Sequence, residues 1–415
     1  MILQSTSPKP FKFFQLPGVG ARLRASHLPS LPFNSSLRSL PLLCVLCVKL
    51  FLFVFLFAMT APISSSQNLD KPLHNIDEDV TAFAIAPDGR IVFSTRRMLK
   101  TKQYELSRDD IWIQDAGGKR RRILEGPKYT RGTQTFSYIV DSFQWSPSGH
   151  FLLARLITTA VSDDSGRSED SFQTLLFDDS GHELRIAKGE NLILDSASAQ
   201  WLTDSNTIAY LSEIAKPQIL SALKFTRISS GAVPSVYEGR TFRDVALIPR
   251  MNFSIAVEQD RAQSGPPRLQ QLDMFNDVDK ELATLEGYET GLSVSPSGRK
   301  VAYFIDREVL EIRDITAPTR LARIRIGLGT YRWTPDESRI LLKRAPQKKS
   351  GYFVSAQIPP LTAVVGGAEI PVTEPALTQL LHGLTIRDFD VSSDDQYLGI
   401  IFPGKRNLMI FPFPR

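Results

Sequence analysis

Apolar and polar residues alternate in seven short segments of the chain, and each segment leads into a turn. Apolar residues stand two and four places before a shared turn position, and the residue between them is small or polar in most copies. This period of two is typical of a β-strand with one buried face. The shared turn positions are Pro87, Pro147, Thr203, Pro249, Pro296, Pro335 and Ser393.

The position two residues before each turn is the most regular feature of the repeat. Tryptophan occupies it in three copies and an aliphatic residue in the other four. We expect these side chains to fill the space between neighbouring sheets, so their role is structural and not that of a ligand platform. The seven structural repeat positions are Ile85, Trp145, Trp201, Leu247, Val294, Trp333 and Val391.

Each turn has the chemistry of a chain reversal. In Ser146–Gly149, proline presets φ for the second position of a type I turn, and glycine accepts a positive φ. A second apolar run, here Phe151–Leu153, follows the turn, so each segment predicts a β-hairpin. Two copies also show a third and a fourth strand, on either side of Gly117–Gly118 and of Ser180–Gly181.

Seven repeats of four antiparallel strands predict an all-β chain that forms a seven-bladed β-propeller. The six intervals between Pro87 and Ser393 average 51 residues, slightly more than the ~40 to 45 of tryptophan-aspartate propellers. Only one strand, Asn407–Phe413, follows the last hairpin. Because an open ring leaves unpaired edges, we expect Leu73–Glu78 to supply the outer strand of the last blade.

The chain begins with a segment of different composition. Residues 40–58 are apolar except for Lys49, and a lysine at a bilayer centre costs about 2.5 to 3.5 kcal/mol. We therefore favour an export signal in which Lys49 precedes the short apolar region Leu50–Ala58 and cleavage follows Ala58 or Ala61. Two alternatives remain open: residues 40–58 are an uncleaved membrane anchor, or translation begins at Met59 and the protein is cytoplasmic.

The predicted organisation has three parts. Residues 1–61 are a basic leader with the signal or anchor, residues 62–72 a polar spacer, and residues 73–415 the propeller. If translation starts at a non-Met codon at position 48, residues 1–47 are not part of the protein. Any membrane contact would come from this leader alone, and only if it stays uncleaved.

The net charge and the cysteines change the picture little. The formal charge is +5, but residues 1–69 contain six basic and no acidic residues, which leaves 43 basic against 44 acidic residues and a charge of −1. The body thus lacks the basic surface typical of nucleic-acid binding. Both cysteines, Cys44 and Cys47, lie in the leader, so the body forms no disulfide and no thiolate metal site.

Catalytic, cofactor and metal motifs are absent from the sequence, and we expect no enzyme, no cofactor and no metal. No G-x-S-x-G motif occurs, and the acidic stretches 163–170 and 277–281 lack the spacing of a calcium loop. The basic run Lys119–Arg122 is expected on a solvated sheet edge. No two histidines have the spacing of a metal site; they are His27, His74, His150, His182 and His382.

The turns Trp145–Gly149 and Ala86–Gly89 resemble the repeats of the TolB-type family of WD-like β-propellers, and no Trp-Asp dipeptide occurs. Members of that family are secreted or periplasmic and mostly hold proteins together at the cell envelope. The resemblance implies an exported, non-catalytic platform for a protein or peptide partner, and we expect the protein to be a monomer.

The alternative is an enzyme or small-ligand binder with its site in the central channel. Three or more carboxylates, histidines or arginines meeting at one channel mouth would favour that alternative, whereas an apolar patch on one face would favour the platform.

Overall fold

The computed structural model describes residues 71–413 with gaps, and the predicted leader lies outside the described residues. Within the described range, no helix is long and apolar enough to cross a membrane. The gaps are at residues 101–104, 127–128, 132–133, 163–164, 166, 185–198, 216–219, 235, 250, 261, 263–264, 277, 288, 317–319, 326, 328, 345–350, 358–376, 380–384 and 393.

The described strands pair antiparallel throughout and form six hydrogen-bonded sheets. One sheet contains β2 (Val80–Ile85), β3 (Ile91–Lys100), β4 (Glu105–Gln114) and β5 (Arg120–Leu124). The next contains β6 (Tyr129–Arg131), β7 (Gln134–Trp145), β8 (Phe151–Ser162), β9 (Ser168–Asp178) and β10 (Glu183–Leu184). The eight-stranded sheet contains β11 (Gln200–Trp201), β12 (Thr207–Ala215), β13 (Leu220–Arg227), β14 (Gly231–Val233), β15 (Phe242–Leu247), β16 (Phe253–Glu258), β17 (Arg268–Asp273) and β18 (Asp279–Thr284).

Three further sheets complete the set. The first contains β19 (Glu289–Val294), β20 (Lys300–Ile305), β21 (Val309–Asp314) and β22 (Arg320–Arg325). The second contains β23 (Tyr331–Trp333), β24 (Arg339–Arg344), β25 (Gly351–Gln357), β26 (Leu377–Gln379) and β27 (Thr385–Ile386). The third contains β28 (Asp388–Val391), β29 (Tyr397–Ile401), β30 (Leu408–Pro412) and β1 (His74–Ile76).

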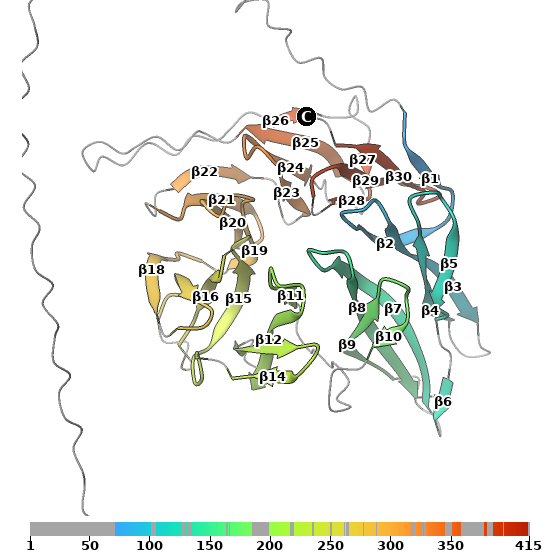
Figure 1. Ribbon diagram of the computed structural model, residues 1–415, viewed down its shortest axis with the longest axis horizontal. Helices are drawn as coiled ribbons and strands as arrows, with labels where there is room; N and C mark the ends of the chain where they lie inside the picture. Colours follow the sequence, from blue (N-terminus) through green and yellow to red (C-terminus); the bar gives the residue numbers. More distant parts are fainter. Residues whose placement is uncertain are drawn as a thin grey trace, which may run out of the picture. The chain divides into compact units, whose positions relative to one another are not determined.

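The eight-stranded sheet consists of two successive parts, β11–β14 and β15–β18. A single residue pair, Ser221 with Phe242, joins them through β13 and β15. Figure 1 shows the sheets arranged around a common centre, with β11, β19, β23 and β28 close to it. This is the arrangement of a β-propeller, so the all-β propeller fold predicted from the repeat is confirmed.

The ring closes through the first strand. β1 pairs with β30, so that His74 lies opposite Ile410 and Ile76 opposite Leu408, and the backbone N–H of Leu73 donates to the carbonyl of Ile410 at 2.7 Å. Figure 1 shows this meeting of the chain's early and late strands. The prediction that Leu73–Glu78 supplies the outer strand of the last blade is confirmed by this pairing. It covers the edge of β30 that an open ring would leave unpaired.

The hydrophobic core lies between the sheets. Among the described residues it divides into seven clusters, each of which joins two consecutive groups of strands. One of them joins the last group to the first and contains Ile76, Phe93 and Ile401. The smallest cluster joins β7–β10 to β11–β14 and has four buried residues, among them Leu153 and Trp201.

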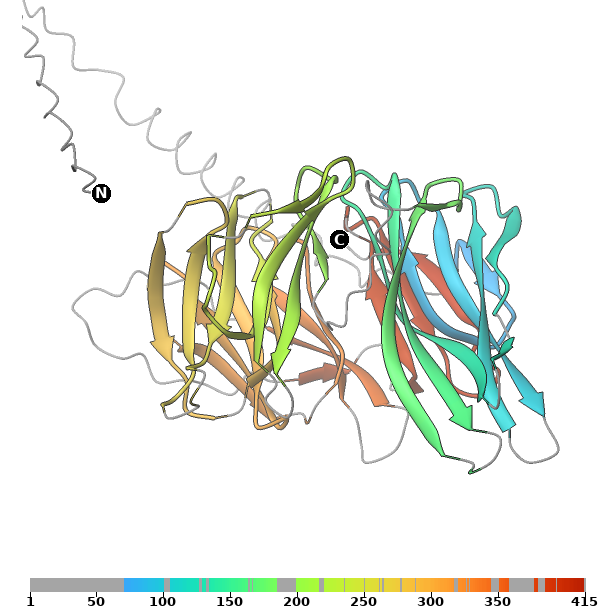
Figure 2. The same cartoon turned by 90° about the horizontal axis from the view of Figure 1, so that it is seen from below.

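Three strands are longer than their counterparts in the other sheets. β7 and β8 have 12 residues each and β9 has 11, and Figure 2 shows these green strands reaching beyond the neighbouring sheets. A bulge interrupts the pairing of β7 with β8 between Val140 and Ser142. One face of these strands therefore extends past the cluster that joins them to the next sheet.

Candidate functional site

The structural repeat positions lie in the interfaces between sheets. Ile85, Trp145, Trp201 and Trp333 are buried, and the other three, Leu247, Val294 and Val391, are partly buried. The indole N–H of Trp145 donates to the carbonyl of Ala84 at 3.3 Å, and that of Trp201 donates to the carbonyl of Gln144 at 3.2 Å. The first bond joins β7 to β2 and the second joins β11 to β7, so each connects two consecutive groups of strands.

The strand that carries each repeat position also carries a residue between the two apolar positions of the repeat, one place before the repeat position. Only two of these seven residues are charged, and they pair with each other, because Arg332 Nε lies 2.7 Å from Asp390 Oδ1. The carboxylate of Asp390 raises the pKa of Arg332. Another, Gln200, bonds to two backbone groups of β15, the Val245 carbonyl at 2.6 Å and the Leu247 N–H at 3.1 Å.

Glu289 is the buried acidic residue of β19. It is 2% exposed and both of its carboxyl oxygens have no hydrogen-bond partner. Burial, with the negative charge of Asp244 nearby, raises the pKa of Glu289 to about 8, so the side chain is mostly neutral at pH 7. Asp244 instead accepts the Leu292 N–H at 2.9 Å. Asp390, Asp244 and Glu289 are thus paired, hydrogen-bonded or buried. Among the described residues, no three metal-ligating side chains come together.

Two of the described histidines lie at one turn, Asp178–Ser180, and the third lies elsewhere. His74 lies on β1, while His150 Nδ1 is 3.2 Å from Asp179 Oδ2 and His182 Nδ1 is 2.7 Å from Ser180 Oγ, all in turns. His27 and His382 lie outside the described residues. No group of three or more metal-ligating side chains occurs in the part of the chain that the structure describes.

The acidic stretches offer no described metal site either. Asp170 Oδ1 accepts the hydroxyl of Thr159 at 2.7 Å, and Asp279 pairs with Arg240 at 2.9 Å. Asp277 and several residues of 163–170 lie outside the described residues.

The basic run lies on β5, the edge strand of its sheet, and its arginines are exposed, which confirms the predicted edge. Arg120 pairs with Glu78 at 2.7 Å. Arg121 donates to the carbonyls of Asp179 and Ser180, at the turn of the neighbouring sheet. These arginines therefore connect neighbouring parts of the ring.

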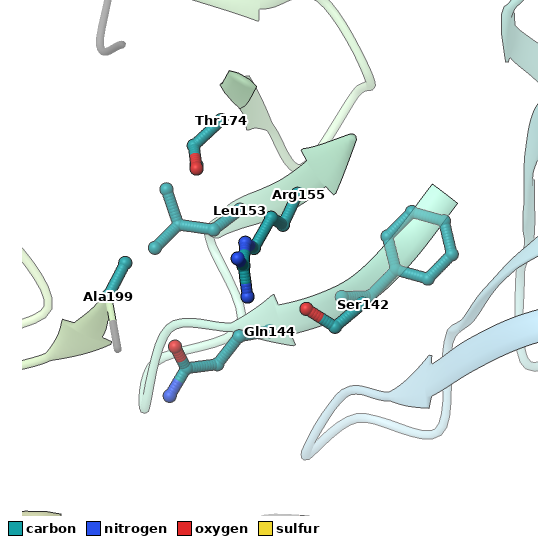
Figure 3. A pocket seen from close by; sticks show the side chains of 7 residues that line it. Ser142, Gln144, Leu153, Arg155, Thr174 and Ala199 are labelled. Atoms are coloured by element: carbon teal, nitrogen blue, oxygen red, sulfur yellow. The ribbon is translucent and has the colours of Figure 1, made fainter. Parts of the chain in front are cut away.

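A small cleft, which we call the β7–β9 cleft, opens beside the long strands (Figure 3). Its volume is about 40 Å³, far below the roughly 300 to 1,000 Å³ of a pocket for a drug-sized ligand. It is lined by Ser142, Phe143, Gln144, Leu153, Arg155, Thr174 and Ala199.

Exposed apolar side chains lie in the turns of the β15–β18 group and in the connection that leads into it. Seven large apolar side chains are exposed in the described part of the chain; three lie in the β15–β16 and β17–β18 turns, and a fourth precedes Tyr237 between β14 and β15. We call these four the apolar patch: Val236, Met251, Phe275 and Val278, with exposed fractions of 38%, 51%, 44% and 62%.

Hydrogen bonds hold the segments of the apolar patch together. The N–H of Met274 donates to the carbonyl of Asn252 at 2.8 Å, which joins the β15–β16 turn to the β17–β18 turn. The buried hydroxyl of Tyr237 donates to the carbonyl of Asp273. Asp273 Oδ1 accepts the N–H of Phe275 at 3.0 Å. The patch is therefore presented by fixed backbone.

The sequence reasoning missed the apolar patch, although one signal was present. Two residues after the shared proline, three repeats have a glycine, Gly89, Gly149 and Gly298, but the fourth has Met251. An apolar residue at the tip of a turn cannot be buried by its own hairpin. That substitution could have marked the patch.

Comparisons with known proteins identify the fold. No family model matches the chain, and no curated protein matches it. A solved structure described as "Crystal Structure of Mitotic Checkpoint Complex" is similar over 85% of this chain and 97% of that chain, with 12% identity and a TM-score of 0.50. That neighbour is a WD40 β-propeller. At this identity the likeness concerns the fold alone, and it shows that this chain has a WD-like β-propeller fold.

Proposed function

We propose that the chain is a seven-bladed β-propeller that acts as a non-catalytic protein-interaction platform, exported to the cell envelope as in the TolB-type family. The blade count takes β11–β14 and β15–β18 as two blades, since one residue pair joins them and a hydrophobic cluster lies between them. The seven repeat positions, from Ile85 to Val391, are packing residues in this proposal.

The observation that carries the proposed function is the apolar patch. Large apolar patches on soluble monomers mark interaction sites, and a hydrogen bond between the β15–β16 and β17–β18 turns keeps Met251 and Phe275 on adjoining segments. Each square ångström of such surface that a partner covers contributes about 25 cal/mol. Because Tyr237 and Asp273 fix the patch, little conformational entropy is lost on binding. The occupant is a protein surface that presents apolar side chains.

Site-specific photo-crosslinking tests this function. A benzophenone amino acid replaces Phe275 in the patch or, as a control, Met98, which is 52% exposed on β3. We expect one protein to crosslink from position 275 and not from position 98. The unlabelled double variant Met251→Ser/Phe275→Ser should no longer compete for that protein, whereas unmodified protein should. Equal crosslinking from both positions, or full competition by the double variant, would contradict the proposal.

The central-channel alternative makes a different prediction. Arg332 and Asp390, which that alternative would use, form an ion pair with each other. In our proposal the variants Arg332→Ala and Asp390→Ala leave crosslinking from position 275 unchanged. A loss of crosslinking in these variants would favour the channel.

Export rests on the leader sequence of residues 40–61. Cell fractionation followed by N-terminal sequencing tests it: a mature chain that begins at Met59 or at Pro62 in the envelope fraction is expected. A full-length membrane form would assign residues 40–58 as an anchor, and a cytoplasmic form that starts at Met59 would refute export. Light scattering of the purified protein should give the mass of a monomer.

A further inference from the structure

Three rows of side chains cross one face of the long strands β7, β8 and β9. Directly opposite residues on antiparallel strands share a face, and the register gives the rows Gln144–Leu153–Leu176, Ser142–Arg155–Thr174 and Ile139–Ile157–Phe172. The first row reaches the core cluster that contains Trp201. The second row lines the β7–β9 cleft, and the third continues the face beyond it.

Arg155 lies in the middle of the cleft, between Thr174 and the pair Ser142 and Gln144 (Figure 3). Its Nη1 is 3.2 Å from Asp141 Oδ2, and its guanidinium lies 4.2 Å from the centre of the Phe172 ring. Its Nε is buried and has no hydrogen-bond partner. Burial outweighs the attraction of Asp141 and lowers the pKa of Arg155, because the buried guanidinium has lost part of the solvation that it has in water.

Thr174 provides a second unpartnered group. Its side chain is 98% buried, since 2% is exposed, and its hydroxyl oxygen has no hydrogen-bond partner. The residue lies directly opposite Arg155 on the neighbouring strand. Buried polar groups in native proteins nearly always have a partner. Two unpartnered groups facing one cleft therefore indicate a missing acceptor.

We propose that the β7–β9 cleft binds a carboxylate that is attached to an apolar group. A carboxylate accepts hydrogen bonds from a guanidinium N–H and from a hydroxyl at once. The cleft volume of about 40 Å³ suits the carboxylate and little more, so the rest of the ligand lies outside. The row Ile139–Ile157–Phe172 adjoins the cleft and is partly or fully exposed, which favours an apolar neighbour. This site is separate from the apolar patch and does not depend on it.

Two sources share this chemistry, the chain end of a peptide with an apolar last residue and a small apolar acid. Calorimetric titration with N-acetyl-leucine and N-acetyl-leucinamide isolates the carboxylate, because the two compounds differ only there. The acid should bind and the amide should not. The peptide Ala-Ala-Ala-Leu and 4-methylpentanoate then separate the sources: tighter binding of the peptide assigns a chain end, and tighter or equal binding of 4-methylpentanoate assigns a small acid. If neither compound binds, the proposal is overturned.

Matched variants locate the site. Thr174→Val removes the hydroxyl with little change in volume and should weaken binding of the acid about tenfold. Thr158→Val is the control, because Thr158 lies on the opposite face of β8. Asp141→Asn, on a half-exposed side chain, removes a competing carboxylate and should tighten binding severalfold.

A purely structural role of Arg155 and Thr174 would not produce this opposite pair of effects. Equal binding of acid and amide, or equal effects of Thr174→Val and Thr158→Val, would overturn the site. If Thr174→Val does not fold, the test rests on Asp141→Asn, and unchanged binding of the acid to that variant would overturn the site.

Discussion

The closing strand can be weakened by one substitution, Ile76→Ala. Ile76 is fully buried and lies in the cluster that joins the last group of strands to the first. Truncation of a buried isoleucine to alanine costs about 2 to 5 kcal/mol. For a ring of residues 73–415, with an unfolding entropy of ~2.1 cal/mol/K per residue, that loss lowers the melting temperature by roughly 3 to 7 °C. Because the ring closes through β1, we expect the whole transition to shift and not one part of it.

Differential scanning calorimetry of Ile76→Ala against Leu73→Ala measures this effect. Leu73 is 52% exposed three residues earlier, so its truncation should change stability by about 0.5 kcal/mol or less. Deletion of residues 68–80 should lower the melting temperature by several degrees as well. A transition of Ile76→Ala that coincides with that of Leu73→Ala, or an unchanged melt of the deletion, would refute closure through β1.

Three further predictions concern single side chains. The pKa of Glu289 is raised from 4.5 to about 8, so the folded state holds this proton more tightly and the stability falls as the pH rises between those values. Glu289→Gln should remove that loss, so that the free energy of urea unfolding depends less on pH between pH 5 and 8. An unchanged pH dependence would contradict this prediction. Trp145→Phe removes a hydrogen bond to the carbonyl of Ala84, whereas the indole N–H of Trp333 has no partner to lose. In urea unfolding, Trp145→Phe should therefore lower the free energy of unfolding by about 0.5 to 1.5 kcal/mol more than Trp333→Phe does. Equal losses would count against the role of that bond. Tyr237→Phe frees the β17–β18 turn and should reduce crosslinking from position 275 with an unchanged circular dichroism spectrum; full crosslinking would show that the turn is held without Tyr237.

The strands and their hairpins could be predicted because their signals are local. Alternation around Trp145 and the proline and glycine of its turn fix a hairpin within about 20 residues. Closure through β1 was also predictable, since counting strands left the last blade one strand short. Hairpins and the number of strands can therefore be predicted from the sequence alone, because they depend on residues that are close together in the chain and on counting.

The cleft and the apolar patch depend on register and exposure, which the order of residues does not contain. Arg155 and Thr174 are 19 positions apart and become neighbours only through the pairing of β8 with β9. Val236 and Phe275 are 39 positions apart, and their segments meet only where the hydroxyl of Tyr237 donates to the carbonyl of Asp273. Such side chains look like ordinary strand or turn residues until the sheets are assembled.

A disulfide across the closing pair tests the closed ring most directly. Asn75 lies opposite Met409, and opposite residues in antiparallel strands have Cα atoms about 4.5 to 5.5 Å apart, within the range for a disulfide. The measurement is thiol titration and calorimetry of Asn75→Cys/Met409→Cys, with Cys44 and Cys47 replaced by serine. The closed ring predicts that the bond forms on oxidation and that the oxidised protein melts higher than the reduced one. Two free thiols after oxidation of the folded protein would contradict it.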